Sequence, residues 1–354
     1  MPKLRSFFWI ALVAVACEDV SNSPLAVSAS PAIVPTGPAW QPIDLGVQPL
    51  FAGPWSVTGI SSVGHVVGIG RVAGLTRAGR VTPAGAWDHL PPLTGDVVSY
   101  VLGVNKNGIA VGLSSTDPRF NSAVPVMWNA QGRPEAVPGL SRSPNATAVA
   151  VNDAGLVIGN GLRRGTTTDV GFVWRPGSAV VPLADAPGNT GGAFAVALND
   201  RGVLLGGYST TGQATGFMLW DRDGRVLSYY LFPGYFLSPA AINNEGEVVG
   251  GGRDAQTLTE IAWVWSSTAG LRILPAPSGA VRPEARAIDD RGRVYGFTHS
   301  PPAPVMWTEG RAAVIPAMGS ASVYMGYASR SGYVPAVDTA GGVRREQVWV
   351  PVRP

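Results

Sequence analysis

The sequence is poor in the residues that build disulfides, zinc sites and basic surfaces. It contains one cysteine, three histidines and two lysines among 354 residues. A single cysteine cannot form an internal disulfide, and the three histidines are too scattered to form a local zinc motif with cysteine. Charged residues make up only 14% of the chain and never form a run of five. This dispersion argues against nucleic-acid binding.

Long apolar runs and helix-forming patterns are also missing. A membrane-spanning helix needs about 20 apolar residues, and no stretch of the sequence reaches that length. The 46 glycines and 31 prolines disfavour a mostly helical fold, because helix interiors tolerate neither residue well. The 45% of hydrophobic residues is nevertheless enough to build a core. The composition therefore excludes both a helical protein and wholesale disorder.

The N-terminus carries an export pattern. Lys3 and Arg5 precede an apolar run of about ten residues, 7–16, as in a secretory signal. Cys17 follows at once, and the segment 13–17 (VAVAC) resembles a bacterial lipobox. That resemblance implies a signal peptide over 1–16, diacylglycerol on Cys17, and a protein anchored in the cell envelope by lipid, because several acyl chains hold firmly.

The lipobox resemblance has one departure and one alternative. Ala14 stands where leucine is usual. An ordinary signal cleaved after Ala16 or Ala29 would instead leave a soluble periplasmic or extracellular protein. In either case, residues 17–39 are rich in Ser, Pro and Ala without periodicity, which predicts a flexible tether.

An internal repeat fills the rest of the chain, 40–354. Its core is an apolar residue, Asn or Asp, two variable residues and Gly, then an alternating apolar stretch that ends in Gly, as in 242–250 (INNEGEVVG). Two markers recur in step every 40 to 47 residues and indicate seven units. They are the turn glycines Gly64, Gly108, Gly155, Gly202, Gly246, Gly292 and Gly332, and the tryptophans Trp87, Trp128, Trp174, Trp220, Trp265, Trp307 and Trp349.

Each unit of about 45 residues contains four short strands. A tight Asn-x-x-Gly turn joins the first strand to the second, because Asn bonds its own backbone there and Gly adopts positive φ. The third strand ends at the tryptophan, and a short turn leads to the fourth. This pattern predicts an all-β fold, a seven-bladed β-propeller with four-stranded antiparallel blades.

The repeat resembles the HAF repeat family of bacterial extracellular proteins. The resemblance rests on the 242–250 pattern, the apolar-Trp element and 43–46 (IDLG), and it covers nearly all of 40–354. It implies an exported propeller-like domain without a settled activity. Because 40–46 matches a fourth strand and 347–349 a third, we expect pairing of the N- and C-terminal strands to close the ring and remove open edges.

The sequence contains no recognisable catalytic constellation. No nucleophile elbow, phosphate loop or dinucleotide fingerprint occurs in context. Asp289 and Asp290 could suggest a metal site, but Asp289 stands where Asn recurs in the other units, so it is interpreted as a turn residue. We therefore expect no enzyme, no metal and no cofactor.

Candidate ligand-binding residues lie in the loops that vary between units. In a propeller, the loops between second and third strands share one face with those between blades, opposite the Asn-x-x-Gly turns. The segment 229–237 carries five aromatic residues, and we place Tyr235 and Phe236 in a loop on this face. Exposed aromatics beside arginine suit sugar stacking or a protein hot spot, whereas local packing is the alternative. The arginine candidates are Arg119, Arg163, Arg164 and Arg253.

These features predict a lipid-anchored cell-envelope protein that displays a monomeric binding or scaffold domain for a protein or glycan ligand. Its contact with the membrane is the lipid alone. The alternative is a polysaccharide-acting hydrolase or lyase, which would need convergent carboxylates about 5–10 Å apart. Acidic residues that break the repeat near strand starts would supply them, and the sequence shows no convincing pair.

Overall fold

The computed structural model describes residues 40–45, 51, 55–167, 169–210, 215–315, 332–338 and 345–351. Cys17, the predicted signal peptide and the predicted tether lie outside these residues. All regular elements of the described part are strands. None of the described residues belongs to a helix long and apolar enough to cross a bilayer. The prediction of an all-β protein is confirmed.

Five of the sheets in the described part are four-stranded and antiparallel, and each follows chain order. They are β2 (Ser56–Ile60), β3 (Val66–Val72), β4 (Leu75–Val81) and β5 (Trp87–Leu90); β6 (Val98–Val104), β7 (Ala110–Ser115), β8 (Ala123–Trp128) and β9 (Pro134–Ala136); β15 (Ala195–Leu198), β16 (Leu204–Ser209), β17 (Thr215–Trp220) and β18 (Val226–Leu231); β19 (Tyr235–Ile242), β20 (Val248–Asp254), β21 (Glu260–Ser266) and β22 (Gly270–Leu274); and β23 (Val281–Ile288), β24 (Val294–Ser300), β25 (Pro302–Thr308) and β26 (Arg311–Val314).

One sheet has five strands, which corrects the expectation of four in every unit. It consists of β10 (Leu140–Ser141), β11 (Thr147–Val151), β12 (Val157–Arg163), β13 (Asp169–Trp174) and β14 (Val181–Pro182). Both β10 and β11 pair with β12. The segment 142–146 therefore interrupts what is one continuous first strand in the other sheets, and its proline at 144 has no backbone N–H to give to a ladder.

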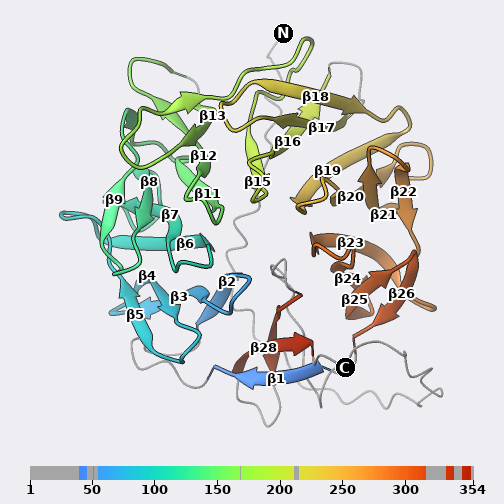
Figure 1. Cartoon of the computed structure of the whole chain (residues 1–354), viewed down its shortest axis with the longest axis horizontal. Helices are drawn as coiled ribbons and strands as arrows, with labels where there is room; N and C mark the ends of the chain where they lie inside the picture. Colours follow the sequence, from blue (N-terminus) through green and yellow to red (C-terminus); the bar gives the residue numbers. More distant parts are fainter. Residues whose placement is uncertain are drawn as a thin grey trace.

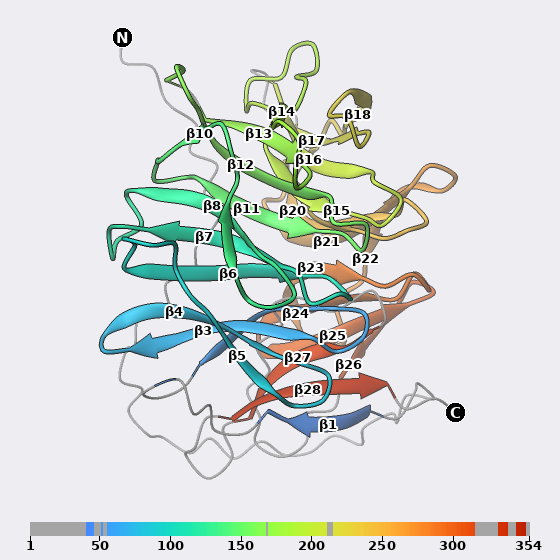
Figure 2. The same cartoon turned by 60° about the vertical axis from the view of Figure 1, so that its left-hand side comes forward.

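The terminal strands pair with each other. β1 (Trp40–Asp44) runs antiparallel to β28 (Arg345–Pro351), with Ile43 opposite Val348, and β28 also pairs with β27 (Val334–Asp338). Figures 1 and 2 both show β1, in blue, beside β28, in red. Buried clusters connect this three-stranded sheet to both neighbouring sheets, since Val348 packs with Val66 and Val334 packs with Tyr295.

The sheets stand around a central axis (Figure 1). In the five four-stranded sheets, the first strand lies inside and the last strand outside. Hydrophobic clusters fill the space between adjacent sheets. Third-strand tryptophans are among the largest fully buried side chains: Trp128, Trp174, Trp220, Trp263 and Trp307. The core is thus a set of interfaces between sheets, and each repeat needs its neighbours to bury its apolar faces.

The repeated asparagine performs two tasks. Within its own turn, the Asn152 Oδ1 accepts hydrogen bonds from the backbone N–H groups of Ala154 and Leu156, at 3.1 and 2.9 Å. Its Nδ2 donates to the carbonyl of Asn199, the same position in the next sheet, at 3.1 Å. The step recurs from Asn105 to Asn152, from Asn199 to Asn243, and from Asn243 to Asp289. We call this series of bonds the asparagine ladder.

The ladder ends at Asp289, because a carboxylate has no N–H to donate. Asp289 instead accepts hydrogen bonds from Arg293 Nε at 2.6 Å and from the Tyr295 hydroxyl at 3.0 Å. Burial and the neighbouring Asp289 charge raise the pKa of Tyr295, so its hydroxyl stays a donor. This supports the interpretation of Asp289 as a turn residue.

The glycine that ends each cassette is required by close packing against the first strand. A Cβ at Gly250 would lie 2.0 Å from the carbonyl oxygen of Ser238, and one at Gly296 would lie 1.9 Å from that of Glu284. Both contacts involve backbone atoms that no side-chain rotation relieves. They occur beside a register shift between the first two strands of each sheet, which is a β-bulge.

Candidate functional site

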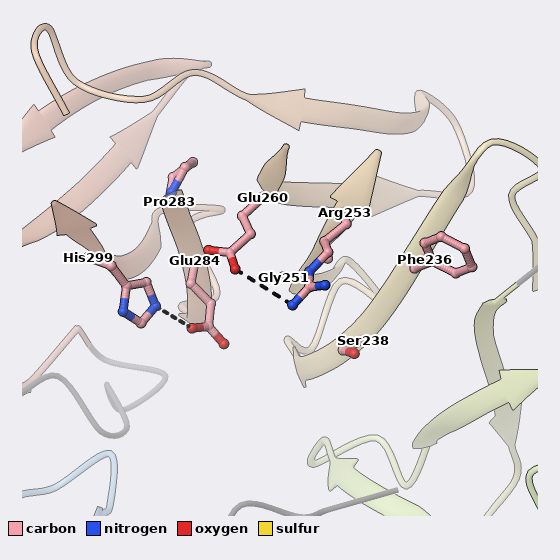
Figure 3. A pocket seen from close by; sticks show the side chains of 9 residues that line it. Phe236, Ser238, Gly251, Arg253, Glu260, Pro283, Glu284 and His299 are labelled. Carbon is pink, nitrogen blue, oxygen red and sulfur yellow. Dashed lines mark hydrogen bonds and ion pairs between the residues drawn. The ribbon is translucent and has the colours of Figure 1, made fainter. Parts of the chain in front are cut away.

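A pocket of about 340 Å³ lies between the sheet β19–β22 and the sheet β23–β26 (Figure 3). β19 and β23 begin at this pocket, and β20 and β24 end there. The pocket therefore lies at the opposite ends of these strands from the asparagine turns, where the sequence predicts the variable ligand-binding loops. It is lined by Phe236, Ser238, Gly251, Gly252, Arg253, Glu260, Pro283, Glu284 and His299.

The pairing of β19 with β20 places an aromatic residue and a cationic residue on the same face of the sheet. Phe236 is the direct partner of Arg253, and Ser238 is the partner of Gly251. Partner side chains project from the same face of a sheet, and both line the pocket. Gly251 leaves room for the neighbouring sheet, because a Cβ there would lie 2.9 Å from the Cγ of Glu284.

Glu260, at the start of β21, is held as an anion. Arg282 donates two hydrogen bonds to its carboxylate, from Nε to Oε2 at 2.6 Å and from Nη2 to Oε1 at 3.0 Å. The bonds from Arg282 hold the pKa of the Glu260 carboxyl below its usual value, against the opposing effect of desolvation. Such a fork fixes the carboxylate in orientation as well as in charge.

The backbone of Arg282 is strained. Its φ is +60°, in the left-handed region that non-glycine residues with long side chains seldom occupy. Such a conformation costs on the order of 1 kcal/mol. It coincides with a break in pairing, since Val281 pairs with Ser300 and Pro283 with Thr298 while Arg282 is skipped.

Glu284 and His299 form a second polar pair in the pocket. The Glu284 Oε2 lies 3.2 Å from the His299 Nε2, and its Oε1 lies 2.7 Å from the Arg286 Nη2. The ring of Phe297 meets the His299 ring edge-on at 4.8 Å between centroids. The Arg286 guanidinium lies 5.8 Å from the centre of the same Phe297 ring. Each of the two carboxylates in the pocket thus has an arginine partner, Arg282 for Glu260 and Arg286 for Glu284.

Arg253 is the least engaged of the cations. Its Nη2 lies 3.9 Å from Glu260 Oε1, too far for a hydrogen bond, and its side chain is 59% exposed. Within the described residues, no side-chain hydrogen bond of Arg253 is found. Figure 3 shows its guanidinium turned toward Glu260 within the pocket, and its N–H donors make no side-chain hydrogen bond there that a ligand would have to break.

The structure brings together only some of the residues predicted from the sequence. Phe236 and Arg253 line the pocket, whereas Tyr235 pairs with Asp254 and packs, half-buried, against a hydrophobic cluster. Placing Tyr235 and Phe236 in a loop is wrong. Both belong to β19, because the long β20 gives these residues backbone partners as far as Asp254.

The remaining arginines lie elsewhere. Arg164 lines a second pocket of about 420 Å³, between the sheet β6–β9 and the sheet with β10, together with Val137, Leu140 and Arg142. The guanidinium of Arg142 is bound by Asp96, at 2.7 Å. Arg119 and Arg163 are exposed and line neither pocket. The predicted arginine candidates do not converge on one site.

Sequence reasoning missed Glu260, Glu284 and His299 as members of one site. Aligning the units on the glycine that ends each cassette places Glu284 in line with Ser56, Tyr100, Thr147, Phe194 and Ser238, whose carbonyls face the equivalent glycines. Glu284 is the one charged residue in that series. The same alignment makes His299 the equivalent of Arg253 in the adjacent unit. A position-by-position comparison of the units could therefore have identified Glu284 and His299 from the sequence.

No metal centre is formed by the described side chains. Among them, no group of three or more His, Cys, Asp or Glu residues is arranged to hold a metal ion. The chemistry of the pocket therefore rests on the aromatic ring, the hydroxyl of Ser238, two carboxylates, an imidazole and the guanidinium of Arg253.

Comparison with known proteins identifies the fold. No protein-family model and no curated protein sequence matches the chain. Among solved structures, the virginiamycin B lyase of Staphylococcus aureus matches with a TM-score of 0.55 at 10% identity, covering 89% of this chain and 99% of the lyase. An oligogalacturonate lyase in complex with manganese matches with a TM-score of 0.53 at 9% identity, covering 82% of this chain and 86% of that one.

The third comparison is with a domain described as a β-propeller. The propeller domain of the Trilobed protease from Pyrococcus furiosus matches with a TM-score of 0.52 at 8% identity, covering 75% of this chain and 82% of that domain. At such low identity these similarities concern the fold alone. Together with the radial arrangement of antiparallel sheets, they show that this chain is a β-propeller.

Proposed function

We propose that this protein is an exported, lipid-anchored propeller of the cell envelope. The export pattern over 1–16, the lipobox-like segment ending at Cys17 and the resemblance to HAF repeats support this proposal. We propose further that the propeller has seven blades closed by the sheet of β1, β28 and β27. Pairing of the chain ends and the contacts of that sheet with both neighbours support closure.

The pocket between β19–β22 and β23–β26 supports a binding role best. The observation that carries this proposal is that the strand partners Phe236 and Arg253 both line one pocket on the variable side of the propeller. An aromatic ring and an incompletely bonded guanidinium in one pocket suit a glycan or a protein hot spot. The protein would then act as a monomeric binding or scaffold module, held at the membrane by its lipid and free of nucleic acid.

The binding role is tested with a glycan array and a pull-down of the lipidated full chain from intact cells. Phe236→Ala removes the ring at the pocket and is expected to abolish capture of the ligand. Tyr229→Ala is the matched control, because Tyr229 is an aromatic residue of the outer strand β18 that is 44% exposed. Equal loss with both variants, or no loss with Phe236→Ala, would remove this pocket as the binding site.

The anchor is tested independently of the ligand. Cys17→Ala is expected to move the protein from the membrane fraction to the soluble fraction and to abolish incorporation of labelled fatty acid. A soluble location and no fatty-acid label for the wild type as well as for the variant would show that an ordinary cleaved signal is used instead.

A second candidate is a polysaccharide-acting hydrolase or lyase. The contact between Glu284 and His299 inside the pocket favours it, because a carboxylate beside an imidazole can orient the ring and support proton transfer. Two of the proteins with similar folds are themselves lyases. Turnover of a bound polysaccharide that disappears in His299→Ala, with binding retained, would establish an enzyme. Binding of the polysaccharide without turnover would instead support the binding module.

A further inference from the structure

The charges in the pocket indicate the chemical class of the ligand more closely than the shape of the pocket does. The lining residues include two carboxylates, Glu260 and Glu284, one guanidinium, Arg253, and the imidazole of His299. Their ion-pair partners Arg282 and Arg286 add two more guanidiniums. Three permanent positive charges therefore face two negative ones at this interface.

The distribution of these charges matters more than their sum. Glu260 has both oxygens bonded by Arg282, and the two Glu284 oxygens contact different groups, the Arg286 guanidinium and the His299 imidazole. Asp254 adjoins Arg253 in the chain, but its carboxylate accepts bonds from the backbone of 256 and 257 within its own turn. Arg253 is the most weakly paired of the three arginines, because its contact with Glu260, at 3.9 Å, is longer than a hydrogen bond and Glu260 is already bonded by Arg282.

Phe236 and the two carboxylates favour a sugar over an acidic peptide as the ligand. The flat ring presents an apolar surface of the kind that packs against the face of a pyranose. Sugar hydroxyls both donate and accept hydrogen bonds. The pocket offers both roles, since Glu260, Glu284 and Ser238 can accept O–H groups while Arg253 donates. An acidic peptide would use the donors but would leave the two carboxylates facing its own negative charges.

We propose that the pocket binds an acidic glycan, with a sugar carboxylate on Arg253, the sugar ring against Phe236, and hydroxyl groups on Glu260 and Glu284. This inference rests on the proposed binding function and adds the chemical class of the ligand. The guanidinium and a carboxylate form a paired, charge-assisted contact. Because Arg253 is well exposed, we expect the charge to contribute about tenfold in affinity, the effect of one such bond.

The experiment compares two matched ligands on the full-length protein. The first is an oligosaccharide of uronic acids, and the second is the same oligosaccharide after reduction of its carboxyl groups to hydroxymethyl groups. Titration calorimetry should give about tenfold tighter binding of the acidic form. That preference should shrink as salt is raised, because the contact lies at an exposed position.

Variants locate the preference. Arg253→Gln should lower the affinity for the acidic oligosaccharide to that of the neutral one and leave the neutral affinity unchanged. Arg71→Gln is the control, because Arg71 is exposed and lies three residues after the equivalent cassette glycine of another unit, near the end of β3. It should change neither affinity.

Failure of this inference is distinguishable from failure of the binding function. Equal affinity for the two oligosaccharides, with both lost in Phe236→Ala, would overturn the assignment of an acidic ligand and leave a glycan-binding pocket in place. Binding of an aspartate-rich peptide without either oligosaccharide would overturn the glycan assignment. An acid preference that survives in Arg253→Gln would overturn the role of Arg253.

Discussion

Replacing Asn199 by aspartate tests whether the asparagine ladder holds adjacent sheets together. Asn199 is fully buried. Its Oδ1 accepts the backbone N–H of Val203 at 2.9 Å, and its Nδ2 donates to the carbonyl of Asn243 in the next sheet at 2.9 Å. Aspartate keeps the first bond and removes only the second, so the change isolates the contact between sheets.

The expected cost follows from the groups involved. Losing the hydrogen bond costs about 1 kcal/mol, and leaving the buried Asn243 carbonyl without its donor costs about 1–3 kcal/mol more. The new carboxylate also faces that carbonyl oxygen, which disfavours its charged form and raises its pKa. We therefore expect Asn199→Asp to lower the free energy of unfolding by about 3 kcal/mol at pH 7.

The loss of stability in Asn199→Asp should depend on pH. A carboxyl whose folded-state pKa is raised destabilises the fold at pH values above its unfolded pKa of about 3.9. Below that pH it is protonated in both states, and the protonated group can donate to the Asn243 carbonyl. The difference from the wild type should thus be largest near neutrality and shrink as the pH falls toward 4.

Urea denaturation followed by tryptophan fluorescence measures the effect, with Asn129→Asp as the control. Asn129 occupies a turn of the same kind, where its Oδ1 accepts the N–H groups of Gln131 and Arg133, and Asp221 fills the equivalent turn of another unit. No described residue accepts a hydrogen bond from the Nδ2 of Asn129. Asn129→Asp should change stability by less than about 0.5 kcal/mol. Equal losses in the two variants would refute the ladder as a stabilising contact.

Three further perturbations follow from the geometry. Gly250→Ala should destabilise the fold by about 2 kcal/mol or more in the same assay, whereas Gly161→Ala, whose nearest non-local atom lies 3.4 Å from the added Cβ, should be tolerated. Arg282→Gln should raise the pKa of Glu260 toward its ordinary value, as read by carboxyl-carbon NMR titration, because the bonds from Arg282 lower it. The stability that the lowered pKa of Glu260 contributes is present above the ordinary pKa of the carboxyl and is lost as the pH falls through the lowered value, and it is small because Arg282 is exposed. Deleting 40–46, which contains β1, should cost on the order of 3 kcal/mol in bonds to β28, and melting at the full-length temperature would contradict ring closure.

The architecture was predictable because the repeat carries local signals. The Asn-x-x-Gly turn, the cassette glycine and the buried tryptophan each act within a few residues of the backbone, so one sequence shows them several times. Strand ends were less predictable. Phe236 belongs to β19 because β20 extends opposite it, and the break at 142–146 depends on how β10 and β11 share one partner.

The site was only half predictable for a different reason. Phe236 and Arg253 stood out by residue type, but their adjacency depends on register, which follows from a bulge between Pro239 and Ala241. Glu284 and His299 belong to the next sheet and face Arg253 only because adjacent sheets pack together. Arg253, Glu284 and His299 are spread over 47 positions of the sequence, from 253 to 299. Their residue types alone do not indicate that they lie close together in space.

Stability and recognition occupy opposite ends of the strands. The turn ends of the sheets carry the repeated asparagines, whose bonds connect successive units from Asn105 to Asp289. The other ends carry Glu284 and His299, side chains that remain partly exposed and that no other unit repeats. Because the ladder does not depend on these residues, substitutions in the pocket should alter binding at little cost to folding. A repeat of this kind can therefore diverge at one end of each unit, and the residues that break its symmetry there are the ones to test for function.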